Sequence, residues 1–333
     1  MKKSLIALAV LGAFAGAAAA QSSATLYGMI DMGYGVGNGG AYEGNKGDDS
    51  KFQQWGNSNS TSRWGLKGQE DLGNGVAVYF NLESKISPED GDTGSKLFDR
   101  AAIVGVKGGF GAIQAGRQTT VVNNVLGQYD ISGTPNLTSA TGNVGISAIS
   151  QQFGVGNNYS RLDSALAYIS PNFSGFSFQG AIVLKNDQAI AGADKNVYTV
   201  GASYANGPFS VGAAFESKPV DGTSASWGIG AKLNFTSFVV SGGYFDNHLE
   251  ADGKGFYLGA ALPINAFTVG AQVAMNTDAP GDLDPLAFEL FAKYKLSDRT
   301  QLYAQTGYLN KDARDFQVAS RKYSASFGIQ HRF

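Results

Sequence analysis

Residues 227–235 read Trp-Gly-Ile-Gly-Ala-Lys-Leu-Asn-Phe, and the character of the side chains alternates along the whole stretch. Trp227, Ile229 and Leu233 take odd positions, whereas Lys232 and Asn234 take even ones. Successive side chains of a β-strand point to opposite faces of the sheet, so a period of two is typical of a strand with one apolar face. The stretch therefore predicts a strand whose other face is polar or lined by glycine.

The same alternation recurs from residue 25 to the end of the chain. Clear examples are 25–34, 76–85, 176–184, 198–204, 209–215, 227–235, 238–244, 256–262, 267–275, 288–296, 302–308 and 323–333. Less regular examples are 62–72, 97–107, 111–117 and 157–170. Together these segments predict about sixteen strands, an even number that is typical of barrels in the outer membrane.

The connections between these segments are unequal in length. Tight turns at 72–76, 108–111, 205–208 and 297–300 alternate with longer polar stretches such as 37–61, 118–156 and 276–285. Outer-membrane barrels have short periplasmic turns and longer outer loops, so we expect the tight turns and both termini in the periplasm. Asn74-Gly75 also suits the left-handed dihedral angles of a hairpin turn.

The two faces of the predicted strands differ in chemistry. The polar positions carry Glu83, Lys85, Lys232, Glu289 and Lys293, which suit a water-filled lumen. A soluble sandwich or propeller, with apolar faces packed on each other, is the alternative. Aromatic rings close to the turns favour a membrane barrel, because such rings prefer the boundary between hydrocarbon and water. Members of this predicted girdle are Phe173, Phe176, Tyr204, Phe209, Phe235, Phe238, Phe267, Tyr303 and Tyr308.

Composition excludes several other classes. Only 16% of the 333 residues are charged, against roughly 25% in an ordinary soluble domain. No run after residue 20 approaches the roughly 18 apolar residues of a membrane helix, so a helical membrane protein is excluded. The chain has no cysteine, which excludes a disulfide scaffold, a thiolate metal site and a cysteine nucleophile. The fold class we predict is all-β, a transmembrane antiparallel barrel.

The first twenty residues predict export. Lys2 and Lys3 precede an apolar segment at 5–15, and three alanines at 18–20 form a small-residue cleavage site. These features are typical of a secretory signal peptide, so we expect a signal peptide at 1–20 and one barrel domain at 21–333. A membrane anchor is the weaker alternative, because the apolar segment is short. The mature chain carries 23 basic and 27 acidic residues, which does not favour nucleic acid as a partner.

Other motifs do not carry chemistry in this context. Residues 35–40 resemble a phosphate-binding loop, but such a loop opens a helix, and the residues after this stretch are polar and glycine-rich. His248 and His331 have no nucleophile in their sequence neighbourhood, so we expect no enzyme activity. Acidic stretches at 89–92 and 278–284 allow calcium binding, although solvated loop ends are the favoured interpretation. We expect no cofactor and no metal site.

Several segments together identify a family. They are Thr25-Leu26-Tyr27-Gly28, Arg63-Trp64-Gly65-Leu66-Lys67-Gly68, Arg100-Ala101-Ala102-Ile103, Gly116-Arg117-Gln118, Tyr168-Ile169-Ser170-Pro171 and the terminal Gln330-His331-Arg332-Phe333. In this order and spacing the chain resembles the general porins of Gram-negative bacteria, of the β-proteobacterial type, over essentially its whole length. The resemblance implies a sixteen-stranded barrel, a homotrimer, and an outer-membrane channel for passive diffusion of ions and small hydrophilic solutes. It also implies that Phe333 is read by the assembly machinery.

The segment 118–156 is long for a connection without regular periodicity, so it needs a functional explanation. By resemblance to the family, we expect it to fold inward as the constriction loop, with Asp130 facing the pore. An external flap is the alternative.

Arginines are the candidates for the narrowest part of the pore. Arg63 shares strand parity with Lys67, opposite Trp64, and Arg161 shares parity with Asp163, opposite Leu162. If Trp64 and Leu162 face lipid, both arginines point into the lumen. The resemblance places Arg63, Arg100 and Arg161 at the constriction, with Arg117 as a fourth candidate. Further candidates for the pore lining are Lys67, Glu83, Lys85, Arg117, Asp130 and Asp163.

Rings of arginine in a narrow pore select anions, so we expect an anion preference. The alternative interpretation is that these arginines are solvated charges balanced by Glu83, Asp163 and Glu289. The alternative function is a solute-specific channel that binds an organic acid or a phosphate-like anion on the same barrel.

Overall fold

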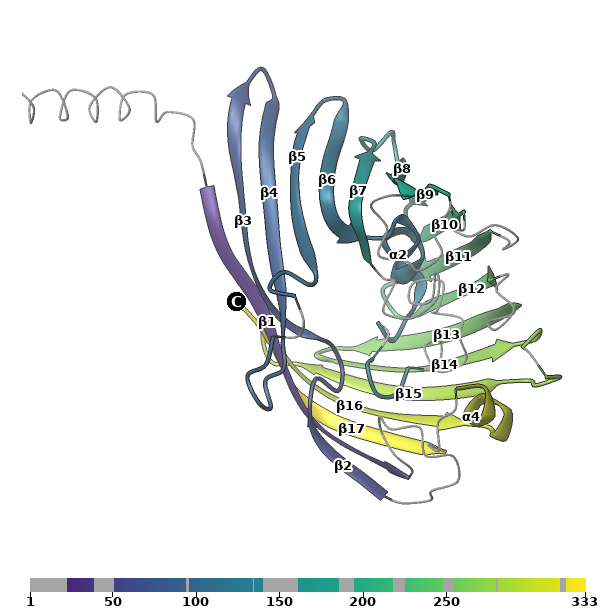
Figure 1. The fold of residues 1–333 in the computed structure, drawn as a ribbon. Helices are drawn as coiled ribbons and strands as arrows, with labels where there is room; N and C mark the ends of the chain where they lie inside the picture. Colours follow the sequence, from purple (N-terminus) through teal and green to yellow (C-terminus); the bar gives the residue numbers. More distant parts are fainter. Residues whose placement is uncertain are drawn as a thin grey trace, which may run out of the picture.

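The computed structural model describes residues 23–38, 51–93, 96–133, 135–139, 161–185, 195–217, 225–247, 254–279, 281–317 and 322–333. The predicted signal peptide, His248 and the first residues of the strand predicted at 157–170 lie outside them. The described residues form one antiparallel sheet that closes on itself around a lumen (Figure 1). None of the described helices is long and apolar enough to cross a membrane.

Seventeen strand segments make up the sheet. In chain order they are β1 (Ser23–Asn38), β2 (Lys51–Gly56), β3 (Ser62–Gly73), β4 (Val76–Ile86), β5 (Ala101–Gly108), β6 (Gly111–Thr119), β7 (Arg161–Ile169), β8 (Phe176–Val183), β9 (Val197–Asn206), β10 (Phe209–Glu216), β11 (Ser226–Asn234), β12 (Val239–Asn247), β13 (Lys254–Ile264), β14 (Phe267–Asn276), β15 (Leu286–Lys295), β16 (Thr300–Leu309) and β17 (Tyr323–Arg332). The helical elements are α2 (Val121–Leu126), the 3-10 turn η1 (Gly127–Tyr129) and α4 (Lys311–Gln317).

The seventeen segments occupy sixteen places in the wall. β2 pairs with the second half of β1, and β3 pairs with the first half of the same edge. β2 and β3 therefore share one strand position of the barrel wall, and we call each such position a stave. β17 pairs with the other edge of β1, from Met29 opposite Arg332 to Gly37 opposite Ser324. Two backbone hydrogen bonds of 3.1 Å between Gly28 and Phe333 extend this seam to the last residue. The predicted closed barrel of sixteen strands is confirmed.

The two faces of the wall follow the predicted parity. On β13, Phe256 and Leu258 are 45% and 56% exposed, whereas Tyr257 between them is 4% exposed. On β9, Val200 is 53% exposed and Thr199 is buried. Large apolar side chains therefore cover the outside. This arrangement suits hydrocarbon outside and polar groups inside.

The predicted tight turns lie at one end of the barrel, which we call the turn end, and we call the opposite end the loop end. Asn74 and Gly75 have φ angles of 55° and 75°, the left-handed values expected for this turn. The predicted girdle needs one correction. Tyr303 is buried and donates to Asp31 on the lumen side, because it has the inward parity of β16.

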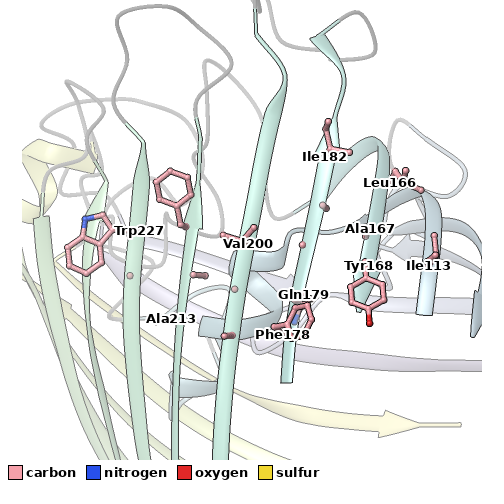
Figure 2. A pocket seen from close by; sticks show the side chains of 17 residues that line it. Ile113, Leu166, Ala167, Tyr168, Phe178, Gln179, Ile182, Val200, Ala213 and Trp227 are labelled. Atoms are coloured by element: carbon pink, nitrogen blue, oxygen red, sulfur yellow. The ribbon is translucent and has the colours of Figure 1, made fainter. Parts of the chain in front are cut away.

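A shallow apolar groove lies on the outer wall across β6 to β11 (Figure 2). Tyr168, Phe178 and Trp227 stand out from the wall there, while Ala202 and Ala213 lie between the larger side chains. Because these residues have the outward parity of their strands, the groove faces the surroundings of the barrel. It is separate from the lumen and forms no part of the passage.

Part of the predicted long loop lies inside the barrel. α2 packs against the inner faces of β9 and β10, with additional contacts to β8 and β11 (Figure 1). Thr120 begins the helix by accepting a hydrogen bond from the Asn123 amide at 3.1 Å. Val121, Val122, Val125 and Leu126 are buried between helix and wall. For the described residues, the inward fold predicted for this loop is confirmed.

Candidate functional site

Four arginines converge on neighbouring staves of the wall. Arg63 is on β3, Arg100 directly precedes β5, Arg117 is on β6, and Arg161 begins β7. Lys85 on β4 stands opposite Arg63 in the strand register, and Lys96 lies in the connection that leads to Arg100. We call these side chains the basic wall patch: Arg63, Lys85, Lys96, Arg100, Arg117 and Arg161.

Tyr27 and Glu83 show that this patch lies on the lumen side. The Tyr27 hydroxyl is 2.9 Å from Glu83 Oε2 and 2.7 Å from Asn81 Oδ1, and the Lys67 ammonium lies 4.9 Å from the Tyr27 ring. Leu26 and Leu66 have the opposite parity, and both are exposed on the outside. The parity expected for Arg63, Lys67, Glu83 and Lys85 therefore agrees with their contacts.

Arg100 is paired with Glu83. Its Nε donates to Glu83 Oε1 at 2.6 Å, and both side chains are 15% exposed. Its backbone amide also donates to the Glu83 carbonyl at 3.1 Å. The strand predicted at 97–107 begins later, at Ala101. One cause is the Asp99 carboxylate, which accepts from the Lys85 amide at 2.7 Å and fixes a turn there.

Asp163 is shared between two basic residues. It accepts from Arg117 Nη1 on one oxygen and from Lys96 Nζ at 2.8 Å on the other. Arg117 Nε also donates to the Asp99 carbonyl at 2.6 Å. Gly116 has a φ of 118° at an irregularity in the β6–β7 register. This irregularity breaks the parity, which is why simple alternation could not place Arg117.

Arg161 completes the cluster, although one premise of its prediction is wrong. Leu162 does not face lipid: it is buried with Ala165, Val183 and Val197 on the inner side. Alternation fails here because Ser164 has a φ of 50° and the register shifts. Arg161 nevertheless interacts electrostatically with Arg100, Arg117, Arg63 and Glu83.

The charges of this region do not cancel. Among the described residues of this region, the six basic side chains of the basic wall patch are accompanied by three carboxylates, those of Glu83, Asp99 and Asp163. Glu83 and Asp163 are engaged by Arg100, Arg117 and Lys96. The formal balance is therefore positive.

The constriction loop covers the opposite wall, and glycines form its seat. A Cβ on Gly230 would lie 2.6 Å from the Tyr129 ring, and one on Gly212 would lie 2.9 Å from the Tyr129 hydroxyl. A Cβ on Gly259 would lie 2.5 Å from Ile131 Cγ2. These glycines have inward parity, so the backbone of the wall can approach the loop closely. Burial raises the pKa of the Tyr129 phenol.

Polar anchors continue this seat along the wall. The Tyr129 carbonyl accepts from Ser241 Oγ at 2.6 Å, and the Ile131 amide donates to Gln272 Oε1 at 3.1 Å. Lys293 Nζ donates to the Ser132 carbonyl at 2.9 Å. The Thr138 hydroxyl donates to Glu289 Oε1 at 3.0 Å, and both side chains are buried. The loop is thus held from β12 to β15.

Asp130 lies at the bend of the loop and is half-buried. Its Oδ1 accepts from the Ser132 amide, the Ser132 hydroxyl and the Gly133 amide at 2.7 to 3.1 Å. Its charge also acts on Lys232 and Lys293. Asp130 therefore shapes its own turn, and its contact with permeating solutes stays a prediction. Among the described residues, no three potential metal-binding side chains converge.

Comparison with known proteins identifies the family. A model of the Gram-negative porin family matches residues 7–314. The chain belongs to this family. Outer membrane porin protein 32 of Delftia acidovorans is 32% identical over 363 aligned residues, and an outer membrane porin protein of Bordetella pertussis is 31% identical over 396. Both alignments cover 100% of each chain.

A solved structure agrees with this assignment. The anion-selective porin from Comamonas acidovorans superposes with a TM-score of 0.77, covers 94% of this chain and 100% of its own, and is 25% identical. The protein is an outer-membrane porin, which makes it a channel and not an enzyme.

Sequence reasoning missed three parts of this porin's lumen. Lys96 directly precedes the strand predicted at 97–107, and Asp99 lies within it, where the irregular alternation assigned neither side chain to the lumen. The inward glycines that accept the loop appear in the sequence only as glycine at alternate positions of a strand. That pattern does not show that a loop packs against them. The segment 57–61, which turns inward between β2 and β3, lay within the polar stretch 37–61 that was predicted to be one long connection; β2 (Lys51–Gly56) inside that stretch was missed as well.

Proposed function

We propose that this porin is a passive diffusion channel with a preference for anions, and that Arg63, Arg100 and Arg161 line its constriction, with Arg117 as a fourth member. The observation that carries the proposal is the positive formal balance of the basic wall patch and its carboxylates. A fixed positive charge in a narrow pore lowers the barrier for anions and raises it for cations. Low-dielectric walls focus this field into the passage.

The position of the loop supports the same proposal. Because residues 120–133 and 135–139 cover the inner wall of β9 to β15, the open part of the cross-section lies towards β3 to β7. A permeating ion therefore passes beside the arginines. The similar porin from Comamonas acidovorans is anion-selective, which agrees with this expectation.

Two further lysines extend the basic surface towards the turn end. Lys67 is exposed on β3, and Lys107 near the end of β5 donates to Gln69 Oε1 at 2.7 Å. Lys107 also lies 5.6 Å from the Tyr79 ring. These contacts hold the aliphatic stems against the wall and leave each charge at the water-filled side.

Single alanine variants of Arg63, Arg100 and Arg161 test the proposal. Purified protein in a planar bilayer under a KCl gradient should give a reversal potential with the sign of a chloride-selective pore. Each alanine variant should shift the reversal potential towards that of a potassium-selective pore. A wild-type pore that prefers cations contradicts the proposal. Conductance that saturates at low concentration of an organic acid or phosphate favours the solute-specific channel instead.

We also propose that the porin is a homotrimer. Outward Leu26 on β1 stands directly opposite Leu66 on β3 in the register, and both are exposed. Further along β1, the exposed Trp55 of β2 packs on Tyr34 with 4.9 Å between the ring centroids, so the outside of this edge is apolar at both places. Such an exposed apolar surface suits a neighbouring barrel. Unheated electrophoresis and light scattering in detergent should give three copies, and a monomeric mass contradicts this assembly.

Export and topology complete the proposal. Residues 1–20 act as a signal peptide, and the turn end with both termini lies in the periplasm. Mass spectrometry of the outer-membrane protein should place the first residue at Gln21. An intact Met1 in that fraction contradicts cleavage.

A further inference from the structure

A five-residue segment, 57–61, leaves the wall between β2 and β3. The β1 edge pairs with Gly56 at Gly33 and with Arg63 at Met29. Residues 30–32 of β1 therefore stand opposite residues 57–62 of the neighbouring β2–β3 stave. Six residues cannot pair with three, so the extra residues leave the hydrogen-bonded ladder. Ser58 shows where they go: a Cβ on Gly33, which has inward parity, would lie 2.8 Å from Ser58 Cβ.

The buried carboxylate of Asp31 holds this segment on its wall side. Oδ1 accepts from the Asn59 amide at 3.2 Å and from the Tyr303 hydroxyl at 2.9 Å, and Oδ2 accepts from Gln330 Nε2 at 3.3 Å. The Asp31 amide donates to Ser62 Oγ at 2.8 Å. Asp31 is 0% exposed, so it joins β1, β16, β17 and the inward segment in one buried network.

The lumen side of the same segment holds residues 135–139, which are the far end of the described part of the constriction loop. The Ser58 carbonyl accepts from the Leu137 amide at 3.2 Å and from Gln305 Nε2 at 3.1 Å. The Asn59 carbonyl accepts from the Asn136 amide at 3.3 Å, and the Asn57 carbonyl accepts from Asn136 Nδ2 at 2.7 Å. Leu137 is 3% exposed and lies over Gly35.

These contacts form a chain from the barrel seam to the loop. A buried carboxylate with this many donors fixes its partners, and removing it leaves several buried donors unsatisfied. The backbone carbonyls of 57–59 are correctly placed for the loop only while Asp31 fixes the segment. We propose that Asp31 is a positioning residue for the pore, and that residues 57–61 form a second constriction element that clamps the far end of the constriction loop.

The inference rests on the family function as a channel, and it is independent of ion preference. It adds an attachment of the loop to the wall at residues 136 and 137, apart from the packing of α2. It also assigns a role in conduction to a residue that contacts no permeating ion.

Two variants test the clamp from its two sides. Asp31→Asn removes the charge and one acceptor, whereas Asn136→Ala removes only the side-chain bond to the Asn57 carbonyl and changes no charge. Asp298→Ala is the matched control, because Asp298 is an exposed acid in a tight turn at the turn end, paired only with Lys295 at 2.6 Å among the described ion pairs. Single-channel recording gives the conductance and the open-channel current noise, and the heat-dependent shift in electrophoresis reports assembly.

Both clamp variants should assemble and show about twofold higher open-channel noise with additional conductance substates, because the released end of the loop moves locally. The control should match the wild type. If Asp31→Asn does not assemble, Asn136→Ala decides alone. Wild-type noise and conductance in an assembled Asn136→Ala channel overturn the proposal, whereas a wild-type protein that forms no channel contradicts the family function itself.

Discussion

Two halves of the same inner wall differ in the side chains that they present to the lumen. From β3 to β7, charged side chains line the lumen and pair across neighbouring strands, as Arg100 and Glu83 do. From β8 to β15, glycines with inward parity and buried polar anchors accept the constriction loop, as Gly230 accepts Tyr129. The difference shows that one barrel wall of nearly constant geometry can be covered by a loop on one side and carry charged side chains on the other, which is the arrangement that the proposed anion preference requires.

The two halves also contribute differently to the stability of the barrel. The covered half gains burial of α2 and Tyr129 together with hydrogen bonds that are protected from water. In the charged half, the Lys96–Asp163 and Arg117–Asp163 pairs keep 20% to 52% of each side chain exposed, and exposed ion pairs contribute little to stability. We therefore expect changes in the covered half to alter assembly and pore size, and changes in the charged half to alter selectivity.

Removing the loop should produce the largest effect. Replacing residues 121–139 by a short Gly-Ser linker takes α2 and its anchored continuation out of the lumen. Conductance should rise about twofold, since the constriction sets the resistance of a wide pore. Single-channel recording in a planar bilayer measures the conductance, and an unchanged value would show that the loop does not set the resistance of the pore.

A single methyl group in the seat should have the next largest effect. Gly230→Ala places a Cβ 2.6 Å from the Tyr129 ring, a distance that forces the loop or the wall to move. We expect a loss of about 1–3 kcal/mol in stability, as for overpacked cores. The heat-dependent shift in electrophoresis should occur at a lower temperature than in the wild type.

Gly109→Ala is the control for this variant. A Cβ on Gly109 has nothing within 4 Å, so its stability should match the wild type. Equal stability of both variants contradicts a tight seat for Tyr129.

Loss of one positive charge should matter more on the charged half than on the covered half. Arg63→Ala should shift the reversal potential towards the cation side by about 10 mV of the roughly 59 mV available in a tenfold gradient. Lys232→Met removes the same charge beside Tyr129, where the Gln128 carbonyl accepts from the ammonium, and should shift it less. Equal shifts would show that the loop does not divide the lumen as described.

Lys107→Ala should give the smallest change. Lys107 is next to the tight turn that starts at Gly108, at the end of the barrel, where the field of one charge is less focused. The reversal potential of the Lys107→Ala channel should lie between the values of Arg63→Ala and the wild type, and close to the wild-type value. A shift as large as that of Arg63→Ala would move the selective region towards the turn end.

Much of this fold could be predicted from alternation alone. Stretches such as 227–235 and 256–262 keep strict parity because they face two different media, and a slip of one residue would expose every side chain to the wrong one. The Asn74-Gly75 turn was predictable because few residue pairs adopt its dihedral angles at low cost. Closure follows from the need to satisfy every backbone group in hydrocarbon.

The candidate site was less predictable, for reasons that the structure makes visible. The positive φ values of Gly116 and Ser164 shift the register, so parity misplaced Leu162 and gave no position for Arg117. Arg100 precedes its strand, and the Asp99 turn that ends the connection depends on a backbone amide of β4. Asp31 accepts hydrogen bonds from Tyr303 and Gln330, which are 272 and 299 positions away from it in the sequence, and no local pattern could predict such contacts.

The sign of the wild-type reversal potential decides whether the charged half of the wall governs ion passage. In a tenfold KCl gradient at low salt, we expect the sign of chloride selectivity and a magnitude below the ideal limit of about 59 mV. Raising the ionic strength at the same ratio should reduce it, because screening shortens the reach of the basic wall patch. A reversal potential of the opposite sign, that of potassium selectivity, would contradict selection by the basic wall patch.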